Sequence, residues 1–179
     1  MDKFLVLIAD DSKTVHNQIT NAIKNVTVEN KPIELESVYS YQEFKNVYEP
    51  NKYALVITDL VMETEDSGIN VINHIRHTVN DTKTRIILMT ANPEKVPQEL
   101  LIRDCDINSY IEKKSMNDFS LKLTVISLLK AYKDIVAFEK AINSIEHVIQ
   151  SSKEMNLEEL LIEVFFQVRS FLTLKSSNI

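Results

Sequence analysis

The sequence predicts an α/β protein with a five-stranded parallel sheet, helices on both faces of it, and a long helical extension. Two observations predict this class. Short, unbroken apolar runs recur from Phe4 to Glu112, and stretches with helical apolar spacing lie between them. Such runs suit strands buried on both faces of a parallel sheet. Alternating strands and helices imply right-handed crossovers, which cover both faces with helices.

Five segments are predicted to form the strands. They are Phe4–Ala9, Ile33–Val38, Tyr53–Asp59, Arg85–Thr90 and Ile107–Glu112. Helices are expected between them, the first of them capped by Ser12 or Asp11 and the fourth, weaker one starting at Pro93. On the first helix, His16 is expected at the surface.

A long helix is predicted from Asp118 to about Ser151, because this stretch has no proline or glycine. Its apolar residues form a heptad seam with one three-residue slip. The seam consists of Leu121, Val125, Leu128, Tyr132, Ile135, Phe138, Ile142, Ile145 and Ile149. This spacing predicts a coiled coil and a homodimer; the alternative is a helix that folds back on its own domain. The predicted organisation is a first domain over 1–130, a helical connector over 131–155, and the start of a second, truncated domain over 156–179, which Asn156 opens.

Composition limits the classes of function. The chain has 179 residues, a net charge of −6 and one cysteine, Cys105. An acidic chain without a basic cluster argues against a nucleic-acid partner. A single cysteine permits no internal disulfide and fits a reducing compartment. No apolar run approaches the roughly 20 residues of a membrane span. We therefore expect a cytoplasmic protein without a membrane partner.

Polar residues stand at the ends of four predicted strands: Asp10 and Asp11, Asp59, Thr90, and Lys113. In a parallel sheet these ends share one edge, so the side chains should converge. Three neighbouring carboxylates repel one another, and a divalent cation would relieve that repulsion. Oxygen ligands favour Mg²⁺ over zinc. A carboxylate beside Mg²⁺, a hydroxyl and an ammonium suits in-line attack on a phosphoryl group.

These residues resemble the receiver domain of two-component response regulators. The matching stretches are Ile8–Ser12, Val56–Met62, Gly68, Leu88–Ala91 and Tyr110–Lys113, and the resemblance covers about residues 1–130. It implies a flavodoxin-like (βα)5 fold. It also implies a phosphorelay protein that takes a phosphoryl group from a histidine kinase or phosphotransfer protein. The receiver would catalyse its own phosphorylation and dephosphorylation, with no classical enzyme activity in this fragment.

The resemblance also implies roles for individual residues. Asp59 would be the phospho-acceptor. Asp11 and Asp59 would bind Mg²⁺ together with the Val61 carbonyl, and Asp10 would act through water. Thr90 would be the switch hydroxyl, Lys113 the phosphate-binding lysine and Tyr110 the switch aromatic residue.

The sequence departs from the family at two places. Glu63 stands where the family usually has proline, and Lys114 stands where a cis-proline normally follows the lysine. A cis bond before a non-proline residue costs ~2.5–4 kcal/mol. A trans bond would change the reach of Lys113, so Lys114 is the alternative for its role.

The loop after Met62 and the stretch around Lys113 resemble a narrower subgroup of receivers. These precede a helical connector and a GAF-like domain, often in cyclic-di-GMP phosphodiesterases and sometimes in diguanylate cyclases or kinases. Two alternatives stay open. One is a degenerate receiver that serves as a dimerisation or docking module. The other is an aspartyl-phosphate phosphatase, although that class needs Asp-x-Asp after the first strand, where this chain has adjacent Asp10 and Asp11.

Overall fold

The structure is a computed structural model that describes residues 2–91, 93, 106–151 and 157–176. The chain forms two compact units, Met1–Lys133 and Asp134–Ile179. The helix expected after Pro93 falls mostly outside the described residues. Within the described part, no helix combines the length and the apolar character that crossing a bilayer requires.

The first unit contains a six-stranded sheet in the order β2-β3-β1-β4-β5-β6. The strands are β1 (Phe4–Ala9), β2 (Thr27–Val28), β3 (Lys31–Val38), β4 (Leu55–Asp59), β5 (Arg85–Thr90) and β6 (Ser109–Glu112). Five of them, β3, β1, β4, β5 and β6, are parallel and confirm the predicted α/β class.

The prediction of five strands was wrong by one, because β2 pairs with β3 in an antiparallel hairpin. Its two-residue loop is Glu29-Asn30, and both residues have positive φ, at 51° and 62°. Positive φ at both central residues is the geometry of the tight turns that join hairpin strands. With only two residues, β2 carries no apolar run that could have revealed it.

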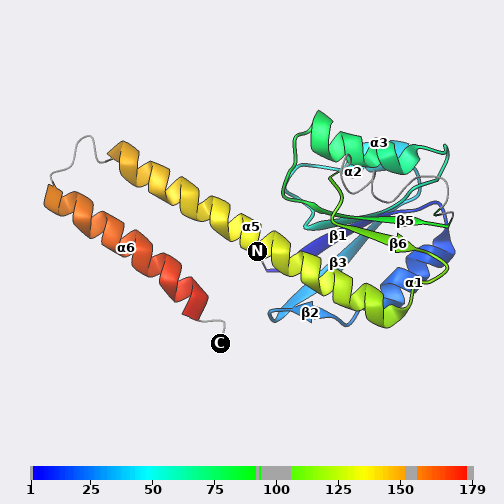
Figure 1. The fold of residues 1–179 in the computed structure, drawn as a ribbon, viewed down its shortest axis with the longest axis horizontal. Helices are drawn as coiled ribbons and strands as arrows, with labels where there is room; N and C mark the ends of the chain where they lie inside the picture. Colours follow the sequence, from blue (N-terminus) through cyan, green and yellow to red (C-terminus); the bar gives the residue numbers. More distant parts are fainter. Residues whose placement is uncertain (1, 92, 94–105, 152–156, 177–179) are drawn as a thin grey trace. The chain divides into compact units, whose positions relative to one another are not determined.

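Helices cover both faces of the sheet. In the first unit these helices are α1 (Lys13–Ile23), α2 (Tyr41–Val47), α3 (Ser67–Asn73), which continues as one π-helical turn η1 (His74–Thr78), and the beginning of α5 (Asp118–Ser151). The rest of α5 and α6 (Leu157–Ser176) belong to the second unit. Figure 1 shows α2 and α3 on one face of the sheet and α1 with the beginning of α5 on the other. This is the doubly wound arrangement that the crossovers require.

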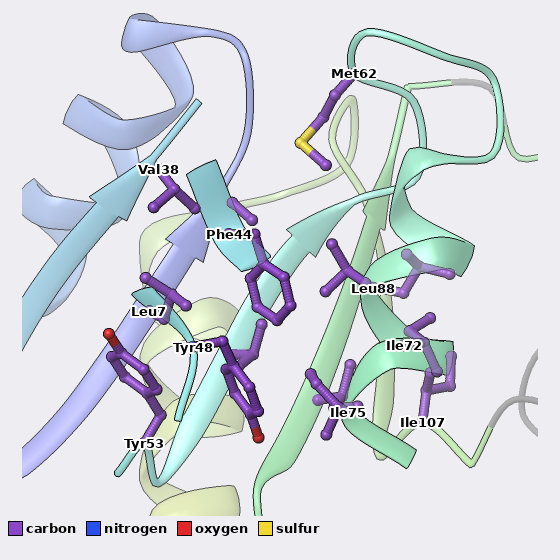
Figure 2. Close-up of a cluster of buried hydrophobic side chains, with 14 of the residues drawn as sticks. Leu7, Val38, Phe44, Tyr48, Tyr53, Met62, Ile72, Ile75, Leu88 and Ile107 are labelled. Carbon is purple, nitrogen blue, oxygen red and sulfur yellow. The ribbon is translucent and has the colours of Figure 1, made fainter. Parts of the chain in front are cut away.

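An apolar core fills the space between the sheet and the α2–α3 layer. Figure 2 shows Phe44 and Tyr48 directed toward Leu88 and Ile75 across this layer. Phe44, Leu88 and Ile75 are completely buried. Met62, from the loop after β4, belongs to the same cluster and is 7% exposed. The core therefore anchors the loop that follows Asp59.

A buried polar network lies where β4 and β5 begin, at the sheet edge opposite Asp59. Asp81 accepts hydrogen bonds from the Tyr48 hydroxyl at 3.0 Å and from the backbone N–H groups of Asn51 and Thr84, both at 2.9 Å. Burial alone would raise the pKa of Asp81, but these donors outweigh it and hold that pKa below its ordinary value. The network joins the end of α2 to the start of β5.

The heptad seam of α5 has two environments. Leu121, Val125 and Tyr132 are at most 1% exposed, so this part of the seam belongs to the core of the first unit. Further along, Phe138 is 65% and Ile145 56% exposed. The alternative of a helix packed on its own domain thus describes the first part of α5. The seam within the second unit presents its apolar residues outward.

Candidate metal and phosphoryl-acceptor site

The predicted site residues converge at the carboxyl edge of the sheet. Asp10 directly follows β1, Asp59 ends β4, Thr90 ends β5 and Lys113 directly follows β6. These four strands are adjacent and parallel. Asp10, Asp59 and Thr90 are 1%, 6% and 1% exposed, although all three are polar. Burying polar groups together is costly unless they satisfy one another or a ligand, which marks this edge as functional.

Lys113 reaches both buried carboxylates. Its Nζ lies 2.7 Å from Asp59 Oδ2 and 2.7 Å from Asp10 Oδ2. Its backbone N–H donates to the Thr90 carbonyl at 2.7 Å, which fixes the start of the loop to β5. The bond between Lys113 and Lys114 is trans, and Lys114 is exposed. A trans bond therefore leaves Lys113 in direct contact with the acidic residues.

The electrostatics of the site follow from burial and from this ion pair. Burial raises the pKa of Asp59, Lys113 opposes that rise, and the neighbouring Asp10 adds to it. Burial alone would lower the pKa of Lys113, but its contacts with Asp10 and Asp59 outweigh this and raise that pKa. Asp59 is thus a carboxylate in a poorly solvated site, and Lys113 stays a cation. Both conditions suit a nucleophile that needs a nearby positive charge.

The site also has the donors for a divalent cation. One oxygen from each of Asp10, Asp11 and Asp59 lies within 4.8 Å of the others. Asp10 Oδ2 is buried and, although Lys113 is close, makes no well-directed hydrogen bond with any group that the structure describes. An all-oxygen set of this kind fits Mg²⁺. The backbone N–H of Val61 contacts Asp59, which helps to stabilise the carboxylate, while the role of the Val61 carbonyl as a metal ligand stays a prediction.

Gly68 is the chain's single glycine and lies where the backbone meets Asp59. A Cβ atom at this position would lie 2.2 Å from the carbonyl oxygen of Asp59. The Gly68 N–H also donates to the Leu60 carbonyl at 3.0 Å. Only a residue without a side chain allows α3 to begin this close to the end of β4.

Glu63, which replaces the usual proline, binds the start of α2. Its Oε1 accepts a hydrogen bond from the Tyr41 N–H at 2.7 Å. The first N–H groups of a helix have no partner within the helix and favour a carboxylate. The substitution therefore links the loop after Asp59 to α2.

Thr90 and Tyr110 occupy neighbouring strands. Tyr110 pairs with Leu88 in the parallel β5–β6 register, two residues before Thr90. Its ring is partly buried and packs against the core of the α2–α3 layer. The two residues lie where a switch would need them, while their roles stay predictions.

The expectation for His16 was wrong, because this residue is buried beside the site. It is 4% exposed and its Nε2 lies 2.8 Å from the carbonyl oxygen of Asp10. Its position three residues before Ile19 and seven before Ile23 places it on the apolar face of α1. That spacing was the signal that could have revealed it.

The doubly wound sheet and its acidic edge with a lysine define a receiver domain of two-component signalling. Residues 6–124, more than half of the chain, match the family described as the response regulator receiver domain. The chain belongs to this family.

One curated relative matches nearly the whole chain. It is the 3'3'-cGAMP-specific phosphodiesterase 2 of Vibrio cholerae, which is 30% identical over 181 residues, covering 98% of this chain and 35% of the relative. The chain therefore spans about a third of that protein.

Two solved structures share the fold. The receiver domain of an HD domain-containing protein from Pseudomonas fluorescens Pf-5 is 17% identical with a TM-score of 0.63, covering 75% of this chain and 92% of that one. The response regulator TrrA from Thermotoga maritima, in complex with Mg(2+)-BeF, is 24% identical with a TM-score of 0.54. It covers 70% of this chain and 98% of TrrA.

Proposed function

We propose that this receiver accepts a phosphoryl group on Asp59 from the phosphohistidine of a sensor kinase or phosphotransfer protein. An Asp59 carboxylate oxygen attacks phosphorus, and a new O–P bond forms as the N–P bond to the donor breaks. The electron pair of that bond returns to the imidazole nitrogen. The observation that carries this proposal is the pair of 2.7 Å contacts from Lys113 Nζ to Asp59 and Asp10.

The residues of the site have distinct tasks in this step. Asp10, Asp11 and Asp59 would hold Mg²⁺, which would supply positive charge to the phosphoryl oxygens. Lys113 supplies a second positive charge and orients one phosphoryl oxygen. Thr90 donates a hydrogen bond to another, and its movement toward the phosphoryl group gives Tyr110 room to rotate. The rotation would repack the surface around β6.

The direct test is incubation with acetyl phosphate and Mg²⁺, followed by intact mass measurement. The wild type should gain the mass of one phosphoryl group, and Asp59→Asn should gain none. Chelation of Mg²⁺ should abolish the gain in the wild type. An adduct that persists in Asp59→Asn would contradict the assignment. A wild type that binds neither Mg²⁺ nor phosphoryl would favour the degenerate receiver.

We further propose that phosphorylation regulates an output that acts on cyclic dinucleotides. The support is the relative named as a 3'3'-cGAMP-specific phosphodiesterase, which matches along 98% of this chain. The test measures hydrolysis of 3'3'-cGAMP and cyclic-di-GMP by the full gene product and by its Asp59→Asn variant. A cytoplasmic location is part of the same proposal and fits the single cysteine.

The signal would pass through a homodimer formed by the later part of α5. Four apolar residues of the seam are exposed there: Phe138 by 65%, Ile142 by 41%, Ile145 by 56% and Ile149 by 59%. Their steps of four, three and four residues place them at the a and d positions of a coiled coil. A second copy of the same helix offers the matching surface.

The charges beside this seam favour parallel helices. Glu139 and Glu146 directly follow the d residues Phe138 and Ile145, so both occupy e positions. In an antiparallel pair e positions face each other, and glutamate would oppose glutamate. In a parallel pair e faces g, and the g residues here are Ala141 and Val148. Parallel pairing therefore avoids the repulsion.

A further inference from the structure

One buried histidine touches the acidic cluster without belonging to it. His16 is 4% exposed, and its Nε2 lies 2.8 Å from the Asp10 carbonyl oxygen. A carbonyl oxygen can only accept, so Nε2 carries the hydrogen and donates it. Nδ1 lies 2.9 Å from Ser37 Oγ, and the Tyr39 ring stands 4.5 Å away between centroids. The ring is held on three sides.

The carbonyl that His16 binds belongs to the peptide between Asp10 and Asp11. A peptide is planar, so fixing its carbonyl also fixes the direction in which the chain enters Asp11. The other polar groups of Asp10 have their own contacts. Its N–H donates to Val38 O at 3.2 Å, and its Oδ1 accepts from the Ser12 N–H at 2.9 Å. The hydrogen bond from His16 is the contact that fixes the orientation of this peptide plane.

Asp11 depends on this plane more than Asp10 and Asp59 do. Its side chain is exposed, whereas the other two carboxylates are buried and contact Lys113. All three must still direct an oxygen to one point for a cation to bind. Small displacements of a ligand weaken a metal site.

We propose that His16 is a positioning residue for the metal site, and that its Nε2–H holds the Asp10–Asp11 peptide so that Asp11 can bind the cation. This rests on the proposed function, because it requires Mg²⁺ at the three carboxylates. Mutation of a group that orients a metal ligand without binding the metal itself typically lowers the metal affinity 10- to 100-fold. A histidine that only filled the core would affect stability and leave Mg²⁺ affinity unchanged.

Calorimetric titration with Mg²⁺ of the full chain distinguishes these roles. His16→Met keeps most of the volume and loses the donor, and we expect it to weaken Mg²⁺ binding about tenfold. His16→Gln has an amide N–H that can donate, and it should restore most of the affinity. Ser37→Ala removes the other hydrogen bond of the ring and should bind Mg²⁺ as the wild type does. Thermal unfolding of each variant reports the stability change separately.

The outcomes separate this inference from the proposed function. If the wild type binds no Mg²⁺, both fail. If the wild type binds Mg²⁺ and His16→Met binds it equally, only the positioning role is wrong. Should His16→Met not fold at the assay temperature, histidine ring NMR of the wild type decides. Addition of Mg²⁺ should then shift the His16 signals more than those of the exposed His77, and unchanged His16 signals would overturn the inference.

Discussion

Lys113 Nζ lies 2.7 Å from Asp59 Oδ2, in direct contact with the side chain that we propose as phospho-acceptor. The same ammonium contacts Asp10. It therefore stands among the oxygens that would bind Mg²⁺. The Lys113 ammonium and a bound Mg²⁺ would contact the same carboxylates, and their positive charges would repel each other. Removing the charge of Lys113 should therefore change metal binding and phosphorylation in opposite directions.

Lys113→Met should bind Mg²⁺ more tightly and accept phosphoryl more slowly. Removing a positive charge beside the carboxylates should increase Mg²⁺ affinity roughly fivefold, since about 1 kcal/mol of repulsion is lost. Phosphorylation should slow because the phosphoryl oxygens lose a compensating charge. Calorimetry measures the first effect, and the rate of mass gain with acetyl phosphate the second.

The exposed Lys114 provides the matched control. Lys114→Met makes the same chemical change one residue further on and should leave both quantities unchanged. If it slowed phosphorylation as much as Lys113→Met, the assignment of Lys113 would be wrong and Lys114 would take its role.

Gly68→Ala should disturb the site without changing any of its polar side chains. The new Cβ would lie 2.2 Å from the Asp59 carbonyl oxygen, so the backbone must move. We expect a loss of about 1–3 kcal/mol in the free energy of unfolding, as for other overpacked sites. Phosphorylation should slow roughly ten- to a hundredfold, because Asp59 moves with its carbonyl.

Urea unfolding measures the first effect of Gly68→Ala, and the mass assay measures the second. Asn73→Ala, at the exposed end of α3, should change neither quantity. A Gly68→Ala variant with wild-type stability and rate would show that the loop has room to adjust.

The sequence predicted the site better than it predicted the contacts around it. Asp10, Asp59 and Lys113 could be placed together because parallel strands end at one edge, which is a property of topology. The hydrogen bond from Tyr41 to Glu63 could not be predicted, since it joins the start of α2 to a loop that is distant in the sequence. His16 was misplaced because a polar residue was assigned to the surface although its helical spacing put it on the apolar face. Periodicity was the stronger signal there.

Strands and helices with a long, continuous sequence pattern were predicted correctly, whereas a short strand that depends on its partner was not. Long apolar runs such as Arg85–Thr90 and the uninterrupted helix Asp118–Ser151 have the predicted ends. β2 has two residues and depends on pairing with β3. The seam of α5 showed one continuous pattern, and only the packing of the first unit reveals that its first part is core.

Asp81 should make stability depend on acid pH. Its pKa in the folded protein lies below the ordinary 3.8. Its stabilisation is therefore complete above the unfolded pKa and is lost as the pH falls through the folded value. Asp81→Asn should lower the free energy of unfolding by about 2 kcal/mol near neutral pH. The difference from the wild type should shrink below about pH 4.

Urea unfolding of wild type and variant across this pH range measures the effect of Asp81. Asp134→Asn, which alters an exposed carboxylate, should give a difference near zero at every pH. A penalty for Asp81→Asn that stayed constant into acid would mean that Asp81 contributes through packing and not through its charge.

Single cysteines on α5 should reveal the direction of the proposed helix pair. With Cys105 changed to serine, Phe138→Cys and Ile149→Cys should each form a disulfide between two copies on mild oxidation. In a parallel pair, identical residues of the seam meet. In an antiparallel pair centred between these positions, identical residues would be about 16 Å apart at 1.5 Å per residue. That exceeds the reach of a disulfide.

An antiparallel pair would instead join the two variants only when they are mixed. Lys140→Cys, on the outer side of the helix, should not cross-link in either arrangement. If neither seam variant cross-links, alone or mixed, this face does not pair two copies.

Comparing the cross-linking yield with and without acetyl phosphate tests whether phosphorylation changes the helix pair. If phosphorylation of Asp59 changes how the helices pair, the yields at positions 138 and 149 should change, because the two positions lie beyond the slip at Ile135–Phe138. Equal yields would separate dimer formation from the switch.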